Sequence, residues 1–142
     1  MPAAYFVVPA SDPQMQQDRL ARFFKACIAV RTLLATAFVA AGWGPAWLRT
    51  LAGSVAAVLA FNFSVAAFRG KKTGAFQEPA WWAPLRPVHA AVWAAVAGLL
   101  FGGVRHGGAL AALDPVVGVV SYVTLRTRYY NAAAATSEAL LL

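Results

Sequence analysis

Three side chains in the sequence could bind a metal or carry protons from within apolar surroundings: His89, His106 and Asp114. Histidine titrates near neutral pH and can bind metals or haem, and an acid inside an apolar stretch is a candidate functional residue because burying its charge is costly. The histidines lack the spacing of a zinc-binding helix, and the sequence has no phosphate-binding glycine loop or nucleophile motif. We therefore predict no catalytic residue, no cofactor, no metal site and no enzyme activity.

The segments that must position these residues are strongly apolar. Of the 142 residues, 61% are hydrophobic and 12% are charged, whereas soluble domains carry about 25% charged residues. The net charge of +7 could attract nucleic acid, but the bases lie between long apolar runs, so we expect no specific nucleic-acid partner. The composition predicts an integral membrane protein with the lipid bilayer as its main surroundings.

Long runs with few charges predict four transmembrane helices, over about residues 24–42, 50–68, 88–104 and 107–125. We expect an all-α fold in which these helices form two helical hairpins joined by the basic loop 69–86. Arg31 lies inside the first span, where its side chain must extend back to the headgroups or face a neighbouring helix.

The membrane domain would cover residues 19–131. Residues 1–18 contain prolines and polar residues and predict an irregular N-terminal arm. Residues 132–142 would form a C-terminal tail.

The distribution of bases predicts the orientation of the four spans. The N- and C-termini would share one side, which would hold ten of the twelve bases: Arg19, Arg22, Lys25, Arg31, Arg69, Lys71, Lys72, Arg86, Arg126 and Arg128. Only Arg49 and Arg105 would lie on the opposite side. Because cytoplasmic segments are enriched in Lys and Arg, we expect both termini on the side equivalent to the cytoplasm.

Polar side chains inside the spans are candidates for contacts between helices: Asn62, His89 and Asp114. An amide or a charge in lipid needs a partner. For Asp114 we expect Arg105 or His106, the nearest bases along the chain, rather than His89, which would lie about half a bilayer away. Because Pro115 follows Asp114, this pair could also cap and start a new helix, so the fourth span is either continuous or broken there.

Two further groups of residues have predicted structural roles. Bases and tryptophans around the central loop should contact lipid headgroups at the membrane border: Arg69, Lys71, Lys72, Trp81, Trp82 and Arg86. Gly98 and Gly102 have the GxxxG spacing that allows close helix packing, so we expect a helix contact at these two positions.

The segments WWAPLRPVHAAVWAAVAGLLF and LAALDPVVGVVSY, within about residues 80–125, resemble small uncharacterised multi-span membrane proteins of nucleocytoplasmic large DNA viruses. In that group an aromatic lead-in and an LRPxH motif open one span, and an aspartate followed by valine and glycine lies in the next. The matching positions are Trp82, Leu85, Arg86, Pro87, His89, Asp114 and Gly118. The resemblance implies a structural component of a virion-associated or virus-modified membrane.

We therefore expect a non-catalytic structural membrane protein that packs against larger membrane or capsid proteins, in a virion or an internal membrane of the host. One alternative is an accessory subunit of a respiratory or photosynthetic complex in an organellar inner membrane. A second alternative is a small proton or ion transporter that uses Asp114, with His89 and Asn62. The sequence does not determine the oligomeric state.

Overall fold

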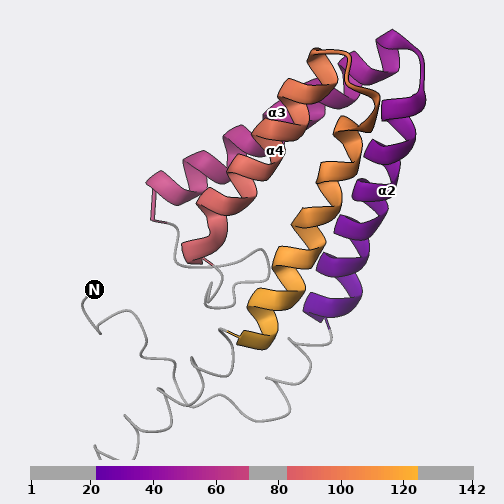
Figure 1. Cartoon of the computed structure of the whole chain (residues 1–142). Coiled ribbons are helices and arrows are strands. Elements are labelled where there is room, and N and C mark those ends of the chain that lie inside the picture. The colour runs from indigo at the N-terminus through magenta and orange to yellow at the C-terminus, as the bar shows by residue number, and fades with distance from the viewer. Residues whose placement is uncertain (1–21, 71–82, 125–142) are drawn as a thin grey trace, which may run out of the picture.

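A computed structural model of the chain describes residues 22–70 and 83–124 (Figure 1). These residues form helices joined by short turns, which confirms the predicted all-α fold for this part of the chain. The elements in order are η2 (Phe23–Ile28), α2 (Ala29–Trp43), α3 (Ala46–Phe68), η3 (Ala83–Leu85), α4 (Arg86–Phe101) and η4 (Arg105–Ala112). The 3₁₀-helix η4 continues directly into an α-helix over residues 113–124.

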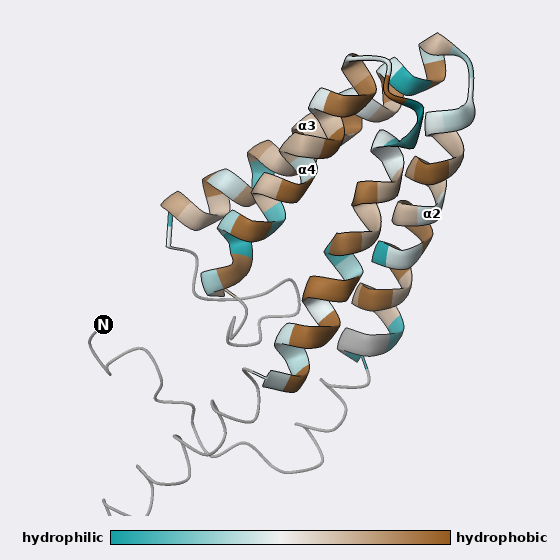
Figure 2. Ribbon diagram, viewed as in Figure 1, coloured by the Kyte–Doolittle hydropathy of each residue, from teal (hydrophilic) through white to brown (hydrophobic). Residues whose placement is uncertain are grey.

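Four of the resulting helices are long and apolar enough to cross a membrane: Lys25–Trp43, Ala46–Phe68, Ala83–Phe101 and Arg105–Thr124. Their number agrees with the prediction. Figure 2 shows that apolar and weakly polar residues cover most of their length. The predicted arm 1–18, the tail 132–142 and most of the central loop lie outside the described residues.

Glycine and proline determine where the helices begin and end. Pro45 has an extended conformation immediately before α3, so this helix begins at Ala46 rather than at residue 50. At the end of α4, Gly103 has a φ of +76°, and its N–H donates to the Leu100 carbonyl at 3.1 Å. The Val104 N–H donates to the Leu99 carbonyl at 2.9 Å, which completes a Schellman motif. These bonds satisfy carbonyls that the end of an apolar helix would otherwise expose.

The packing of the helices differs from the predicted hairpins. α3 packs most extensively against α4, and α2 packs against η4, whereas α2 and α3 contact each other much less. Figure 1 shows these two pairs side by side, with one pair inclined to the other. The turn between α2 and α3 explains the difference, because Gly44 and Pro45 are both extended and direct α3 away from α2. The start of α2 and residue 124 lie at the same end of the molecule (Figure 1).

The core lies where small residues of α3 meet larger residues of α4. Gly53, Ala56 and Ala60 form the buried positions of α3. Trp93, Val96 and Leu100 of α4 are each at most 2% exposed, and Phe38 and Ala111 extend the same cluster. Small side chains on one helix let the large side chains of the other approach its backbone. This close van der Waals packing is typical of helices that associate in lipid.

The predicted contact at Gly98 and Gly102 is wrong. Both glycines are exposed, and a Cβ added to Gly98 would meet nothing within 4 Å. Close backbone contact occurs instead between α2 and η4, where a Cβ on Gly42 would collide with the Arg105 carbonyl and one on Gly108 with the Phe38 carbonyl. The GxxxG spacing identifies a small-residue face, but it does not show which helix face meets a neighbour.

Candidate functional site

Three helices bring ionisable and aromatic side chains to one point inside the molecule. Arg31 comes from α2, His89 and Trp93 from α4, and Asp114 from the first turn of the helix over residues 113–124. His89 and Trp93 are four residues apart, so they project from the same face of α4. Asp114 is 1% exposed and His89 is 2% exposed. We call Arg31, His89, Trp93 and Asp114 the polar cluster.

The Asp114 carboxylate is the centre of the polar cluster. Its Oδ2 accepts a hydrogen bond from Arg31 Nη1 at 3.0 Å, which is also a salt bridge. Its Oδ1 lies 2.5 Å from His89 Nδ1 and accepts a hydrogen bond from Trp93 Nε1 at 3.1 Å. Both carboxylate oxygens therefore have partners, as a buried carboxylate requires.

The contact between His89 and Asp114 determines which imidazole nitrogen donates a hydrogen bond. A nitrogen and a carboxylate oxygen at 2.5 Å share a proton, so Nδ1 donates to Oδ1. Arg31 Nη1 also lies 3.2 Å from Nδ1, but a nitrogen that donates to the carboxylate cannot accept from the guanidinium at the same time. With a neutral imidazole, the positive charge of Arg31 and the negative charge of Asp114 cancel within the cluster.

Aromatic rings enclose the polar cluster. Phe63 of α3 stacks on the His89 ring, with centroids 5.2 Å apart, and the Arg31 guanidinium lies 5.6 Å from the centre of the same Phe63 ring. Phe38 contacts Trp93 edge to face at 5.0 Å. Because α3 contributes Phe63, all four apolar helices contact this region. An apolar enclosure strengthens the interaction between the charges and keeps other polar groups away from them.

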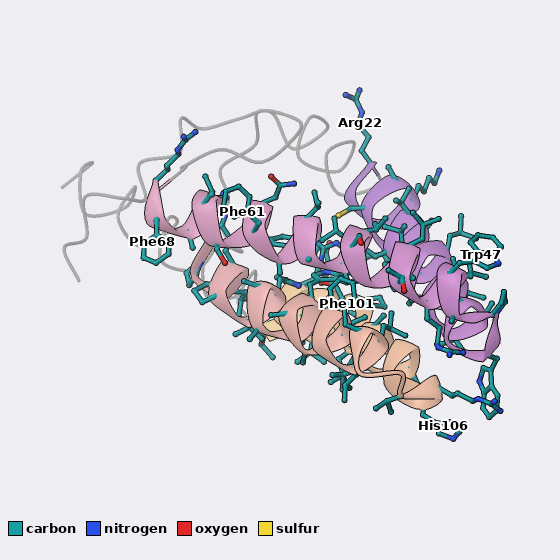
Figure 3. All side chains as sticks on the ribbon, turned by 90° about the horizontal axis from the view of Figure 1, so that it is seen from above. Arg22, Trp47, Phe61, Phe68, Phe101 and His106 are labelled. Carbon is teal, nitrogen blue, oxygen red and sulfur yellow. The ribbon has the colours of Figure 1, made fainter. Side chains whose placement is uncertain are left out.

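The predicted partners of Asp114 are wrong. Arg105 and His106 are exposed, and His106 packs against Trp43 with ring centroids 4.7 Å apart. His89, which we expected half a bilayer away, contacts the carboxylate directly. Figure 3 shows His106 at the far end of the bundle.

The helix geometry of the fourth span explains this error. A 3₁₀-helix rises about 2.0 Å per residue against about 1.5 Å for an α-helix, so the eight residues of η4 carry Asp114 about 4 Å further from Arg105. This brings Asp114 toward the level at which His89 and Arg31 lie. The helix changes from 3₁₀ to α between Ala112 and Leu113, just before the pair Asp114 and Pro115, and the span is not interrupted there.

Arg86 is buried, which corrects its predicted position at the lipid headgroups. It is 2% exposed, and its Nη1 donates to the Ala66 carbonyl at 3.0 Å, in the last turn of α3. A base near the end of a helix satisfies a free carbonyl and the negative end of the helix dipole. Arg69 is exposed, as a border residue should be. The remaining predicted border residues lie outside the described part of the chain: Lys71, Lys72, Trp81 and Trp82.

Asn62 lies on the exposed surface of α3, and its side chain makes no hydrogen bond among the described residues. The contact of Asn62 with another helix therefore stays a prediction.

Sequence reasoning missed two members of the polar cluster. The sequence predicts that Arg31 extends to the headgroups or faces a neighbouring helix, but it does not assign Arg31 to Asp114, because no rule of spacing connects positions so far apart in the chain. Trp93 could have been found, since it lies one helical turn after His89 and its indole N–H needs an acceptor when it is buried.

The cluster connects three helices through hydrogen bonds and a salt bridge, so it can hold them together. The described residues contain no group of three or more His, Cys, Asp or Glu side chains placed to hold a metal ion. The sequence and the fold were compared with known proteins: no family model, no curated protein and no solved structure matches the chain.

Proposed function

We propose that the chain is an integral membrane protein with a structural role, in which the polar cluster fixes the packing of four transmembrane helices. Its outer surface then packs against lipid and against other membrane or capsid proteins. Both termini lie on the side of the membrane that carries the excess of bases. The membrane location and the structural role are proposed because, among the described residues, ionisable groups pair inside the bundle and many apolar side chains lie on its surface.

The observation that carries the proposal is the internal pairing of the intramembrane charges. Arg31 and Asp114 pair at 3.0 Å, and the remaining carboxylate oxygen is occupied by His89 and Trp93. Outside the core, each of the four helices exposes several large apolar side chains, among them Leu33 at 70% and Phe61 at 67%. Polar groups inside and apolar groups outside suit a protein whose solvent is lipid.

The residues on which the resemblance to small membrane proteins of large DNA viruses rests have a structural explanation in this arrangement. His89 and Asp114 contact each other, and Arg86 binds the end of α3. These contacts support a role of the motif in bundle packing. The location in a virion or a virus-modified membrane is proposed from the resemblance alone, and an accessory subunit of an organellar complex would need the same packing. The proteins that co-purify with the full chain in mild detergent distinguish these two locations.

The short contact between His89 and Asp114 favours a second candidate function, proton transfer across the membrane. The imidazole donates from Nδ1, and Nε2 has no hydrogen bond among the described residues, so it could accept a proton. A carrier of this kind would depend on Asp114 to orient the ring.

One experiment separates the two functions. The purified chain and its Asp114→Asn variant are reconstituted in liposomes with a pH gradient, and their thermal unfolding is measured in detergent. The structural role predicts no proton flux from either protein and a loss of about 1 to 3 kcal/mol of stability in the variant, because the partly buried Arg31, whose side chain is 15% exposed, loses its charged partner.

The matched control is Leu113→Val, next to Asp114 on a surface where Leu113 is 45% exposed. It should leave both measurements unchanged. A proton flux in the unmodified chain that Asp114→Asn abolishes would establish transport and reject the purely structural role.

A further inference from the structure

Asn62 stands out among the polar side chains inside the described helices. The hydroxyl groups of the helices donate to the carbonyl four residues earlier, at Thr32, Thr36, Thr50, Ser54, Ser64, Ser121 and Thr124. The ionisable groups of the polar cluster bond to one another. Asn62 is exposed and has no hydrogen bond within the described residues. Its donors and acceptor thus have no partner among the described residues, and a second chain could supply one.

The amide of Asn62 lies at the depth of the hydrocarbon core if α3 crosses a membrane. It is six residues from the end of the helix at Phe68, which corresponds to about 9 Å along the axis. The hydrocarbon core extends about 15 Å on each side of the bilayer centre. The asparagine side chain is too short to reach headgroups over this distance, so lipid cannot satisfy it.

Asn62 belongs to a regular stripe on the outer surface of α3. Leu51, Val55 and Val58 precede it at spacings of four, three and four residues, and they are 55%, 42% and 58% exposed. At about 100° per residue, this stripe is about 160° from Gly53, Ala56 and Ala60, which contact α4. Figure 3 shows Phe61, the neighbour of Asn62, projecting from α3 on the side away from α4.

This stripe has the pattern of a two-stranded parallel coiled coil. The spacing assigns Val55 and Asn62 to a positions, and Leu51 and Val58 to d positions, of a heptad. β-branched residues at a favour two strands, and a single asparagine at a sets the register and the oligomeric state. A carboxamide also complements itself, because its N–H groups can donate to the oxygen of an identical amide.

We propose that α3 of a second copy of this chain packs in parallel on the stripe Leu51, Val55, Val58 and Asn62, with the two Asn62 amides hydrogen-bonded across a two-fold axis. All copies enter a membrane with the same orientation, so identical residues lie at the same depth and these amides can meet. An asparagine of an unrelated helix would need the same depth and register by coincidence. The inference rests on the proposed membrane location.

Cysteine cross-linking in liposomes of phosphatidylcholine tests this dimer directly. In a Cys27→Ala background, Val58→Cys should form a disulfide-linked dimer on mild oxidation, because d positions face each other across the axis. Val120→Cys is the matched control, since Val120 is 55% exposed on the fourth helix, outside the stripe. Equal cross-linking at positions 58 and 120, or none at either, contradicts the dimer.

Substitution of the amide tests the hydrogen bond itself. Asn62→Val should weaken dimerisation about 3-fold to 20-fold for each of the two symmetry-related hydrogen bonds that it removes, and Asn62→Gln should retain most of the affinity. Single-molecule photobleaching in liposomes measures the dimer fraction, and circular dichroism checks that each variant is folded. An unchanged dimer fraction in Asn62→Val, or a monomer at every protein-to-lipid ratio, overturns the proposal.

Flotation of the liposomes separates this inference from the proposed function. If the chain does not float with the lipid, the membrane location and the dimer both fail. If it floats but stays monomeric, only the dimer fails.

Discussion

Asp114 shows how one buried carboxylate can organise a bundle of apolar helices. It binds a guanidinium, an imidazole and an indole N–H from two other helices, at distances between 2.5 and 3.1 Å. In lipid the alternative to such partners is an unpaired charge, whose cost exceeds that of most apolar substitutions. The stability of the bundle should therefore depend on each donor to this carboxylate. This includes Trp93, whose large apolar ring also packs in the core.

Trp93→Phe tests the contribution of a single donor. The substitution keeps an aromatic ring against Phe38 but removes the indole N–H that donates to Asp114 Oδ1. We expect a loss of about 1 to 2 kcal/mol of stability, because one oxygen of the carboxylate loses a hydrogen bond. Thermal unfolding in detergent measures this loss.

Trp47→Phe is the matched control, since Trp47 is 67% exposed at the start of α3. The loss of stability in Trp47→Phe should be at most about half of the loss in Trp93→Phe. If both substitutions change stability equally, the hydrogen bond of Trp93 does not contribute.

The helices approach one another at glycines that the sequence pattern does not distinguish from other glycines. Gly42 and Gly108 lie where α2 and η4 pass, and each leaves room for a carbonyl of the other element. Gly98 belongs to a more familiar motif but lies on an exposed surface. Close packing thus depends on whether a glycine faces a neighbouring helix in the assembled bundle.

Gly108→Ala should be destabilising and Gly98→Ala should not. The new Cβ at position 108 would collide with the Phe38 carbonyl, and relieving this overlap must separate α2 from η4, at a cost of about 1 to 3 kcal/mol. At position 98 the Cβ meets nothing within 4 Å, and alanine has the higher helix propensity. Comparison of the two melting temperatures in the same detergent checks this prediction. Equal melting temperatures would show that the close contact is absent.

At the scale of the whole molecule, two inclined helix pairs share one polar cluster. α3 packs on α4, and α2 packs on η4, while Arg31, His89 and Asp114 connect the two pairs. The described chain enters α2 and leaves the fourth helix at the same end (Figure 1). In a membrane, as we propose, the two ends of the described chain, residues 22 and 124, would therefore lie on the same side, the side that we predict from the distribution of bases.

Accessibility of introduced cysteines tests this orientation. In the Cys27→Ala background, Arg69→Cys and Val104→Cys place a thiol at opposite ends of the α3 and α4 pair, and both positions are exposed. A membrane-impermeant maleimide should label position 69 from the side of the termini and position 104 only from the other side. Labelling of both positions from one side would contradict the arrangement of four spans.

Much of the fold follows from the sequence alone because apolar run length is a local property. About twenty uncharged residues have few structures other than a helix in lipid, so the existence and number of the helices could be predicted. Polar residues inside such runs also need partners, and this identified His89 and Asp114 as residues that must make polar contacts, although not as partners of each other. Proline and glycine at residues 44–45 and 102–103 determined helix ends for the same local reasons.

Only the tertiary structure decided which residues meet. The contact between Arg31 and Asp114 joins positions far apart in sequence, and it depends on the 3₁₀ geometry of η4 and on the inclination of the helix pairs. The same geometry buried Arg86 and left Asn62 on the surface. Periodicity specifies which residues share a helix face, but the direction of that face and its depth depend on all the helices together. For this reason the sequence determined the elements, and the packing determined the polar cluster.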